Sequence, residues 1–242
     1  MYEKGPKDLV TEADRLAQSV VQSILLNAFP DHEFLGEEDS PAAIPNTAGP
    51  TPRSTQGVLR WVVDPLDGTA NYVHGLPGFA VSIALERDGE VLTGVVFDPI
   101  LNECYVAVKG EGAFLNGKRL KASSCDALRD AMVAASFPAN VERSSPEIAT
   151  FAEVLVASQS LRRLGSAALN LSYLAAGRVD AYWATSVKPW DVAAGVLLVR
   201  EAGGIMTAVD GTPFRLSEPK FAAAATPKLH AELVAILNSR PE

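Results

Sequence analysis

The sequence predicts an α+β fold in which helices and sheets are stacked in layers across two lobes. In the first half, segments with strand character follow one helix and favour a mainly antiparallel sheet. From about Ser124 strands and helices alternate, yet no glycine fingerprint of a dinucleotide-binding fold accompanies them. We therefore expect one lobe in residues 1–124 and a second lobe in residues 125–242.

Composition limits the classes of protein to which the chain can belong. Its hydrophobic fraction of 48% and charged fraction of 21% are ordinary for a globular protein. A net charge of −8 argues against nucleic acid as a partner, because phosphate backbones are bound by surplus Lys and Arg. The 2 cysteines are too few for a disulfide scaffold, and no apolar run reaches the roughly 18 residues of a membrane span. With no signal peptide visible, we expect a cytoplasmic protein that binds neither nucleic acid nor membrane.

The first predicted element is a helix that begins at Thr11. Thr11 and Asp14 fit a capping pattern, so Asp14 is explained either as a charge at the helix start or as a functional group. Apolar residues then recur on one helix face, at Leu16, Val20 and Ile24. A short strand over residues 33–39 ends in three consecutive acids. The proline-rich segment of residues 40–57 predicts a mobile loop or lid.

The stretch from Trp61 to Asn71 is the strongest local signal in the sequence. It indicates a buried strand that stops at Asp64 and Asp67, turns at Gly68 and opens a helix at Thr69. Free N–H groups at a helix start attract an anion, so two acids aimed there conflict with it. A divalent cation between the carboxylates and a phosphate resolves the conflict. Helix capping by Asp67 and Thr69 is the ordinary alternative, and both interpretations can hold at once.

The remaining elements follow from turn residues and periodicity. Strands are predicted over residues 79–86, 90–98, 104–108, 131–136, 161–164 and 179–183. A glycine-rich turn is predicted over residues 110–117. Helices are predicted over residues 166–176 and 191–202, and a last helix begins at Thr226-Pro227.

Acidic residues at the predicted ends of these elements point to metal-assisted phosphate chemistry. A phosphomonoester dianion repels hydroxide, so a hydrolase must neutralise the phosphate and lower the pKa of a water molecule, and paired cations do both. Magnesium prefers oxygen ligands, mainly carboxylates. The candidate ligands are the side chains of Glu37, Asp64, Asp67 and Asp191, and the carbonyl of Leu66.

Five blocks of the sequence resemble one family. Residues 64–74 (DPLDGTANYVH) resemble the first signature of the inositol monophosphatase family of magnesium-dependent, lithium-sensitive phosphatases, and residues 190–195 (WDVAAG) resemble the second. Supporting blocks occur in the same order at residues 8–14, 36–38 and 112–117. The resemblance covers essentially the whole chain from Lys4. It implies a layered αβαβα sandwich of the sugar-phosphatase type, in which the two lobes form one catalytic unit with the site between them, usually as a homodimer.

The same resemblance implies a set of metal ligands. Glu37, Asp64 and the Leu66 carbonyl would hold a first Mg²⁺ ion. A second ion would be held by Asp64, Asp67 and Asp191, in a site that takes two or three ions. Glu38, beside these residues, is either a solvated charge or a group that supports the ligands.

Catalytic and substrate-binding roles are implied as well. Thr69, paired with Asp14, would orient and activate the attacking water. The N–H groups of Gly68 and Thr69 would bind the phosphate. The residues that would line the alcohol side of the substrate are Gly165, Ser166 and Ala167.

The chain departs from the family pattern in two places. Inositol-specific members carry a glutamate that bonds the substrate hydroxyls where this chain has Ala184. An alanine cannot accept those hydrogen bonds, so the identity of the alcohol stays open, with Thr185 or Ser186 as weaker substitutes. Family members also carry a helix before the block at residues 8–14. We therefore expect either that the start codon is assigned too far downstream, or that another subunit or segment covers exposed apolar surface.

The leading hypothesis is a Mg²⁺-dependent phosphatase that hydrolyses a phosphomonoester of a small polyol or alcohol by metal-activated water. Inositol phosphate, histidinol phosphate, a sugar phosphate and a phosphoadenosine nucleotide are the alternatives within the family. The alternative of another class is a catalytically silent binding or scaffold protein. The intact acidic residues argue against that alternative.

Overall fold

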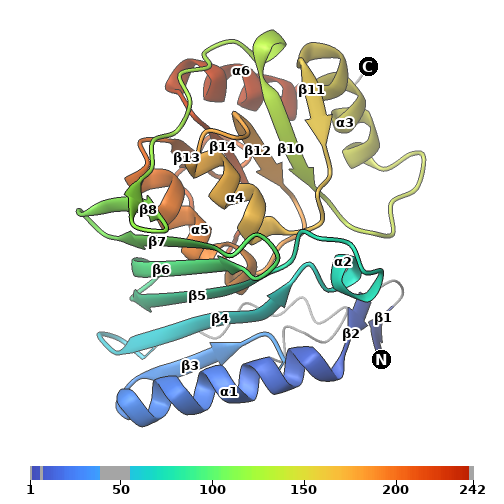
Figure 1. Cartoon of the computed structure of the whole chain (residues 1–242). Helices are drawn as coiled ribbons and strands as arrows, with labels where there is room; N and C mark the ends of the chain where they lie inside the picture. Colours follow the sequence, from blue (N-terminus) through green and yellow to red (C-terminus); the bar gives the residue numbers. More distant parts are fainter. Residues whose placement is uncertain (1, 6–7, 39–54, 240–242) are drawn as a thin grey trace.

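The structure is a computed structural model that describes residues 2–5, 8–38 and 55–239 (Figure 1). The predicted lid over residues 40–57 therefore lies outside the described residues except for its last three positions. The helices are α1 (Glu12–Ala28), α2 (Thr69–Val73), α3 (Pro146–Ala157), α4 (Ala167–Ala175), α5 (Pro189–Glu201) and α6 (Pro227–Asn238). The strands are β1 (Tyr2–Gly5), β2 (Asp8–Val10), β3 (Glu33–Gly36), β4 (Leu59–Asp67), β5 (Ala80–Arg87), β6 (Glu90–Asp98), β7 (Glu103–Val108), β8 (Gly112–Leu115), β9 (Lys118–Arg119), β10 (Met132–Ser136), β11 (Ser160–Arg162), β12 (Ala181–Ala184), β13 (Ile205–Thr207) and β14 (Phe221–Ala224).

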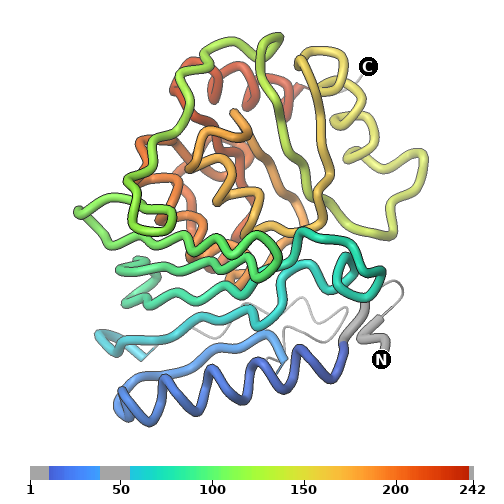
Figure 2. The backbone as a smooth tube through the Cα atoms, in the orientation of Figure 1, coloured from blue at the N-terminus to red at the C-terminus, as the bar shows by residue number. Residues whose placement is uncertain are grey.

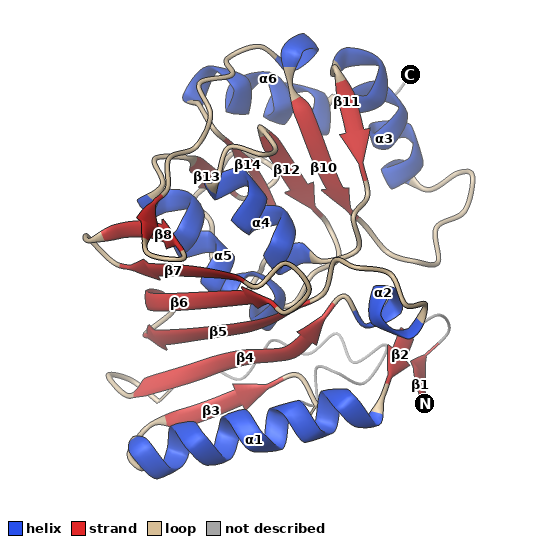
Figure 3. Ribbon diagram, viewed as in Figure 1, coloured by secondary structure: helices blue, strands red, loops and turns tan. Residues whose placement is uncertain are grey.

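Two large sheets alternate with layers of helices, and β1 pairs with β2 in a separate two-stranded sheet. The seven-stranded sheet has the order β3-β4-β5-β6-β7-β8-β9, and only its β3–β4 pair is parallel. The five-stranded sheet has the order β11-β10-β12-β14-β13, with β10 parallel to both its neighbours. Figure 3 shows α1 below the first sheet, α4 and α5 between the sheets, and α3 and α6 on the far side of the second. This arrangement confirms the predicted α+β class and its layers.

The chain completes the seven-stranded sheet before it enters the five-stranded sheet. The tube in Figure 2 runs through β3 to β9 in blue to green, and then through β10 to β14 in green to red. The catalytic candidates from Glu37 to Thr69 therefore come from the first sheet, and those from Gly165 to Asp191 come from the second half. The division at residues 124 and 125 stays a prediction.

Small residues bring the middle helices close to the first sheet. A Cβ atom on Gly94 of β6 would lie 2.8 Å from the Cα atom of Ala194 in α5. A Cβ atom on Gly195 would lie 2.5 Å from the side chain of Leu171 in α4. Because real Cβ atoms do not approach other atoms so closely, Gly94 sets the distance between the first sheet and α5, and Gly195 sets the distance between α5 and α4. That distance positions Asp191, which lies in the first turn of α5.

Helix α1 is rotated relative to the apolar stripe that the sequence suggests. Leu16, Val20 and Ile24 are 58%, 56% and 63% exposed, whereas Asp14 and Gln18 are buried. The polar residues face inward because both have partners there. The side-chain oxygen of Gln18 accepts a hydrogen bond of 2.9 Å from the Glu38 amide. The helix therefore turns Asp14, Gln18 and the partly buried Val21 and Leu25 inward in place of the predicted stripe.

Some elements differ from the sequence prediction. The glycine-rich segment of residues 110–117 contains the strand β8, which pairs with β7, rather than turns alone. Helix α3 and the strands β13 and β14 were not predicted. The strands concerned have three or four residues, which is too short to establish a period of two. Within the described ranges, every helix is too short or too polar to cross a membrane.

Candidate active site

The end of β4 places two carboxylates next to a tight turn. Asp64 and Asp67 are 2% and 8% exposed, and the β4–β5 register shifts between them. Pro65 lies inside this bulge, where its missing N–H costs no ladder hydrogen bond. Gly68 then has φ of 95°, which favours glycine, and a Cβ atom there would lie 2.8 Å from the Gly78 carbonyl oxygen. The absence of a side chain at Gly68 therefore lets the chain at Gly78 and Phe79 pack directly against this turn.

The capping interpretation of this turn is wrong for α2. Gly68 is the N-cap residue of α2, and no side chain caps the helix. Asp67 instead caps α4, which lies far away in the sequence. Its Oδ2 atom accepts hydrogen bonds from the Ser166 hydroxyl, 2.5 Å, and from the Ala168 amide, 2.7 Å. One carboxylate thus lies in the same turn as Asp64 and also takes part in the packing of α4.

Glu37 and Asp191 approach Asp64 and Asp67 from two other elements. Glu37 directly follows β3, and its amide donates to the Val63 carbonyl at 3.2 Å, which places it beside Asp64. Asp191 is partly buried in the first turn of α5, where its Oδ2 atom accepts a 2.8 Å hydrogen bond from the Lys188 amide. Three of the four acids predicted as ligands therefore converge on Asp64.

The pKa values of these carboxylates reflect their burial and mutual repulsion. Burial, and then the charge of Glu37, raises the pKa of Asp64 well above its ordinary value. Burial, followed by the charge of Asp67, does the same to the pKa of Asp191. Burial also raises the pKa of Asp67 to about 6, although the hydrogen bond from Ser166 lowers it. The cluster, named here the acidic cluster (Glu37, Asp64, Asp67 and Asp191), is stable as a set of anions only when a cation neutralises it.

The donors of the acidic cluster fit magnesium. Asp64 uses Oδ1 to accept a 2.9 Å hydrogen bond from the Leu66 amide, and within the described part of the chain its Oδ2 atom has no donor. Among the described residues, no three acidic, His or Cys side chains already enclose an ion by themselves. Magnesium prefers oxygen ligands, mainly carboxylates, and keeps several waters, so an open set of acidic oxygens suits it.

Asp14 and Thr69 form a hydrogen-bonded pair at the edge of the acidic cluster. Asp14 is 1% exposed, and its Oδ2 atom accepts from the amide and the hydroxyl of Thr11 at 2.8 and 2.5 Å. The Thr69 hydroxyl lies 3.1 Å from Asp14 Oδ1 and 3.0 Å from the Leu66 carbonyl oxygen. A hydroxyl has one proton, so it donates to one of these two acceptors at a time and accepts with its lone pairs.

The residues predicted to line the alcohol side of the substrate differ in their exposure to solvent. Gly165 is exposed, whereas Ser166 and Ala167 are buried, and the Ser166 hydroxyl is engaged by Asp67 and by the Leu169 amide. Ala184 is fully buried in the core between the sheets. A longer acidic side chain at that position would therefore need space that the core does not offer.

Sequence reasoning gave no role to Asn71, although it lies in the central stretch. The Asn71 amide donates two hydrogen bonds of 2.8 Å, one to the Gly78 carbonyl and one to the Leu164 carbonyl. Leu164 directly precedes residues 165–167, named here the substrate loop, in the second half of the chain. No local pattern signals such a long-range contact.

Comparison with known proteins agrees with this geometry. The model of the Inositol monophosphatase family matches residues 2–242. An inositol-1-monophosphatase of Rhizobium meliloti is 44% identical over 210 residues, which cover 86% of this chain and 75% of that protein. A Nus factor SuhB of Pseudomonas aeruginosa is 39% identical over 97% of this chain and 84% of its own length. The solved inositol monophosphatase of Anabaena (Nostoc) has a TM-score of 0.83 and 36% identity, over 96% of this chain and 88% of that one. The chain therefore belongs to the inositol monophosphatase family, and is a phosphoric monoester hydrolase.

Proposed function

We propose that the protein hydrolyses a phosphomonoester of a small polyol or alcohol, with Mg²⁺ held by the acidic cluster. The observation that supports this most directly is the crowding of buried carboxylates at Asp64, beside the Asp14–Thr69 pair. Repelling carboxylates are costly for a fold that has no use for them. A catalytically silent protein would have no reason to retain them.

The ligands are assigned in two sets. Glu37, Asp64 and the Leu66 carbonyl would hold one ion, and Asp64, Asp67 and Asp191 would hold another. Bound Mg²⁺ neutralises the phosphate and lowers the pKa of a water molecule. Since Asp67 Oδ2 is committed to α4, Asp67 has its Oδ1 atom to offer a metal.

Thr69 orients the attacking water. When its hydroxyl donates to Asp14, the lone pairs of Thr69 Oγ1 face away from that bond and accept a hydrogen from water. Asp14 is held by Thr11 and is buried, so its position does not depend on substrate. The pair therefore acts as a fixed acceptor for the proton that water loses.

The N–H groups of Gly68 and Thr69 bind the phosphate. They lie at the start of α2, where they have no partner within the helix. The left-handed turn at Gly68 aims successive N–H groups to the same side. The alcohol leaves toward Gly165, which is exposed.

The substrate is a small phosphorylated alcohol, with inositol phosphate as one candidate. Ala184 offers no acceptor for hydroxyl groups, and the Thr185 hydroxyl beside it is buried with no partner in the described part of the chain. Selectivity for a polyol is consequently weak, so several alcohols are hydrolysed with similar kcat/KM.

A substrate panel tests the proposal. The purified protein is assayed for phosphate release from inositol phosphate, histidinol phosphate, a sugar phosphate and a phosphoadenosine nucleotide, with Mg²⁺ or with EDTA. We expect Mg²⁺-dependent release from at least one substrate, and inhibition by Li⁺. No release from any member of the panel by folded protein would overturn the proposal.

The resemblance also supports a homodimer in the cytoplasm. Light scattering coupled to size-exclusion chromatography measures the first property, and a mass of one chain of 25.6 kDa at all concentrations contradicts it. Cell fractionation measures the second.

A further inference from the structure

One amide side chain ties the phosphate-binding turn to the substrate loop. Asn71 Nδ2 lies 2.8 Å from the carbonyl oxygen of Gly78 and 2.8 Å from that of Leu164. Gly78 lies against the turn at Gly68, and Leu164 immediately precedes Gly165. The two carbonyls come from opposite halves of the chain. A single planar NH₂ group therefore sets the distance between them.

The space around this amide leaves little freedom. Gly165 has φ of 92°, and a Cβ atom there would lie 2.7 Å from Asn71 Nδ2. A Cβ atom on Gly78 would lie 3.2 Å from the same nitrogen. The Asn71 carbonyl also accepts a 2.9 Å hydrogen bond from the Leu76 amide, which closes the loop after α2. The side chain and main chain of Asn71 are thus both fixed.

The tie acts on groups at both ends of the proposed reaction. Asn71 follows Thr69 by half a turn of α2, so a shift of Asn71 moves the hydroxyl that faces water. Leu164 and Gly165 lead into Ser166, whose hydroxyl donates to Asp67. The attacking water and the leaving alcohol must lie in line with the phosphorus, so the spacing between these two segments decides the rate.

We propose that Asn71 is a positioning residue, which keeps the Thr69 end and the Gly165 end of the site in register through its two hydrogen bonds. The proposal rests on the proposed phosphatase function. It goes beyond that function by naming a residue that touches neither substrate nor metal and yet controls kcat.

The first test is Asn71→Ala, with Asn238→Ala as its matched control. Asn238 Nδ2 also donates to two backbone carbonyls, those of Val209 and Val234 at 2.9 and 2.8 Å, but it lies at the end of α6. We expect kcat to fall about 100-fold in Asn71→Ala, as for a misplacement of about 1 Å, and to stay unchanged in the control. We expect inhibition by inorganic phosphate, which reports on the metal and phosphate end alone, to stay within about threefold of wild type. A kcat within about threefold of wild type would overturn the proposal.

A further variant separates hydrogen bonding from packing. Asn71→Leu keeps the shape of the side chain without its donors and should lose as much kcat as Asn71→Ala, so retained activity counts against the tie.

Hydrogen exchange provides a readout that needs no activity. The Ala168 amide is bonded to Asp67, so its protection reports on whether the loop after Leu164 stays in place. We expect faster exchange over residues 164–168 in Asn71→Ala and wild-type exchange in Asn238→Ala. Equal protection in both variants would refute the tie even if the wild-type protein hydrolyses none of the substrates tested.

Discussion

The two ends of α4 are joined to the seven-stranded sheet by hydrogen bonds to a carboxylate, and the two joints differ in the charge of the donor. At its N-terminal end, Ser166 and Ala168 donate to Asp67, a buried carboxylate whose pKa is raised to about 6. Just after its C-terminal end, Arg178 forms a two-pronged ion pair with Glu103, with both N–O distances at 2.6 Å. The first joint uses neutral donors on a crowded anion, and the second uses a full positive charge.

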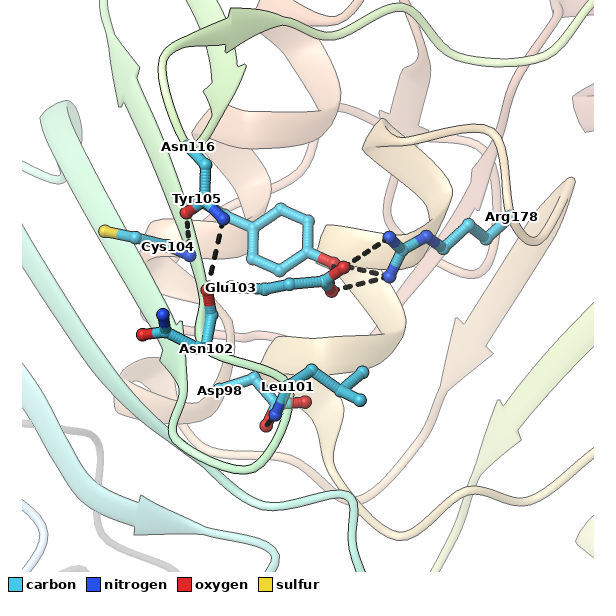
Figure 4. Close-up of polar contacts among 8 residues, drawn as sticks. All are labelled: Asp98, Leu101, Asn102, Glu103, Cys104, Tyr105, Asn116 and Arg178. Atoms are coloured by element: carbon cyan, nitrogen blue, oxygen red, sulfur yellow. Dashed lines mark hydrogen bonds and ion pairs between the residues drawn. The ribbon is translucent and has the colours of Figure 1, made fainter.

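Figure 4 shows how the second joint is built. The Tyr105 hydroxyl lies between the partners: it donates to Glu103 at 2.6 Å and accepts from Arg178 at 2.9 Å. Arg178 also lies over the ring of Tyr173, 5.4 Å from its centre. Beside them Asn116 bonds the Cys104 amide and the Asn102 carbonyl, which fixes the turn into β7. Both carboxylate oxygens of Glu103 accept hydrogen bonds from Arg178. These bonds lower the pKa of Glu103.

The difference shows which end of the helix the reaction depends on. The joint at Glu103 is satisfied by the protein alone, so it stabilises the fold whatever is bound. The joint at Asp67 shares its carboxylate with the acidic cluster, so its strength depends on what neutralises that cluster. Four changes test this contrast.

The largest effect is expected from Asp64→Asn. This change removes one charge of the acidic cluster and leaves both joints of α4 intact. We expect kcat to fall about 10³-fold or more, because a metal ligand is lost. The metal-free variant should melt at the same temperature as wild type or higher, since like charges no longer repel. Full activity of the variant would exclude the assignment of Asp64 as a ligand.

Stability of the metal-free protein should fall as pH rises from about 4 to about 6. The pKa of Asp67 is raised from 3.8 to about 6, so between these values the folded state binds more protons than the unfolded state. Protonation of this one group at low pH therefore contributes about 3 kcal/mol to the free energy of unfolding. Denaturant titrations in EDTA measure it. Adding Mg²⁺ should raise the melting temperature more at pH 7 than at pH 5, and an equal shift at both values would contradict the coupling.

Ser166→Ala weakens the joint at Asp67 alone. The hydroxyl donates to a carboxylate and also caps α4 by accepting from the Leu169 amide, so its loss should cost about 2 kcal/mol of unfolding free energy. The pKa of Asp67 should rise further, because the hydrogen bond from Ser166 lowers it. Urea denaturation at several pH values checks both effects. An unchanged pH dependence would show that the joint is not coupled to the acidic cluster.

Glu103→Gln weakens the other joint and should have the smallest effect. The Arg178 side chain is 41% exposed, so solvent screening limits the loss to about 1 kcal/mol. The pKa of Glu103 is lowered, so its contribution is present above about pH 4.5 and is lost as pH falls through the folded value. The kcat should equal that of wild type. A kcat below that of wild type would remove the contrast between the two ends.

Most of the fold could be predicted from the sequence, because its larger elements carry local signals. The hairpin around Asp88 and Gly89, the helix after Thr11 and the last helix after Thr226 are confirmed. The rotation of α1 could not be predicted, since it depends on partners of Asp14 and Gln18 that lie on other elements. A periodic apolar stripe indicates a helix but does not show which face is covered.

The candidate site was predictable to the extent that its residues are adjacent in sequence. Asp64 and Asp67 share one turn, and Glu37 and Asp191 were candidates because they lie at the predicted ends of other elements. The bond from Ser166 to Asp67 spans 99 positions, and the Asn71 bond to Leu164 spans 93. Contacts of that range depend on how the layers meet, which no local pattern encodes. The same reason applies to Ala184, whose burial follows from the packing between the sheets.

Because Gly94 has no side chain, a substitution at this position would disturb the acidic cluster. Helix α5 lies against β6 with no room for a methyl group, and Asp191 is carried at the end of that helix. A substitution at Gly94 would displace the helix, so a change in the sheet would alter the position of Asp191, one turn before Ala194, relative to the other acids. Loss of activity in a variant of this family therefore need not involve any residue that binds metal or substrate. The distance between the layers is therefore itself a requirement for catalysis.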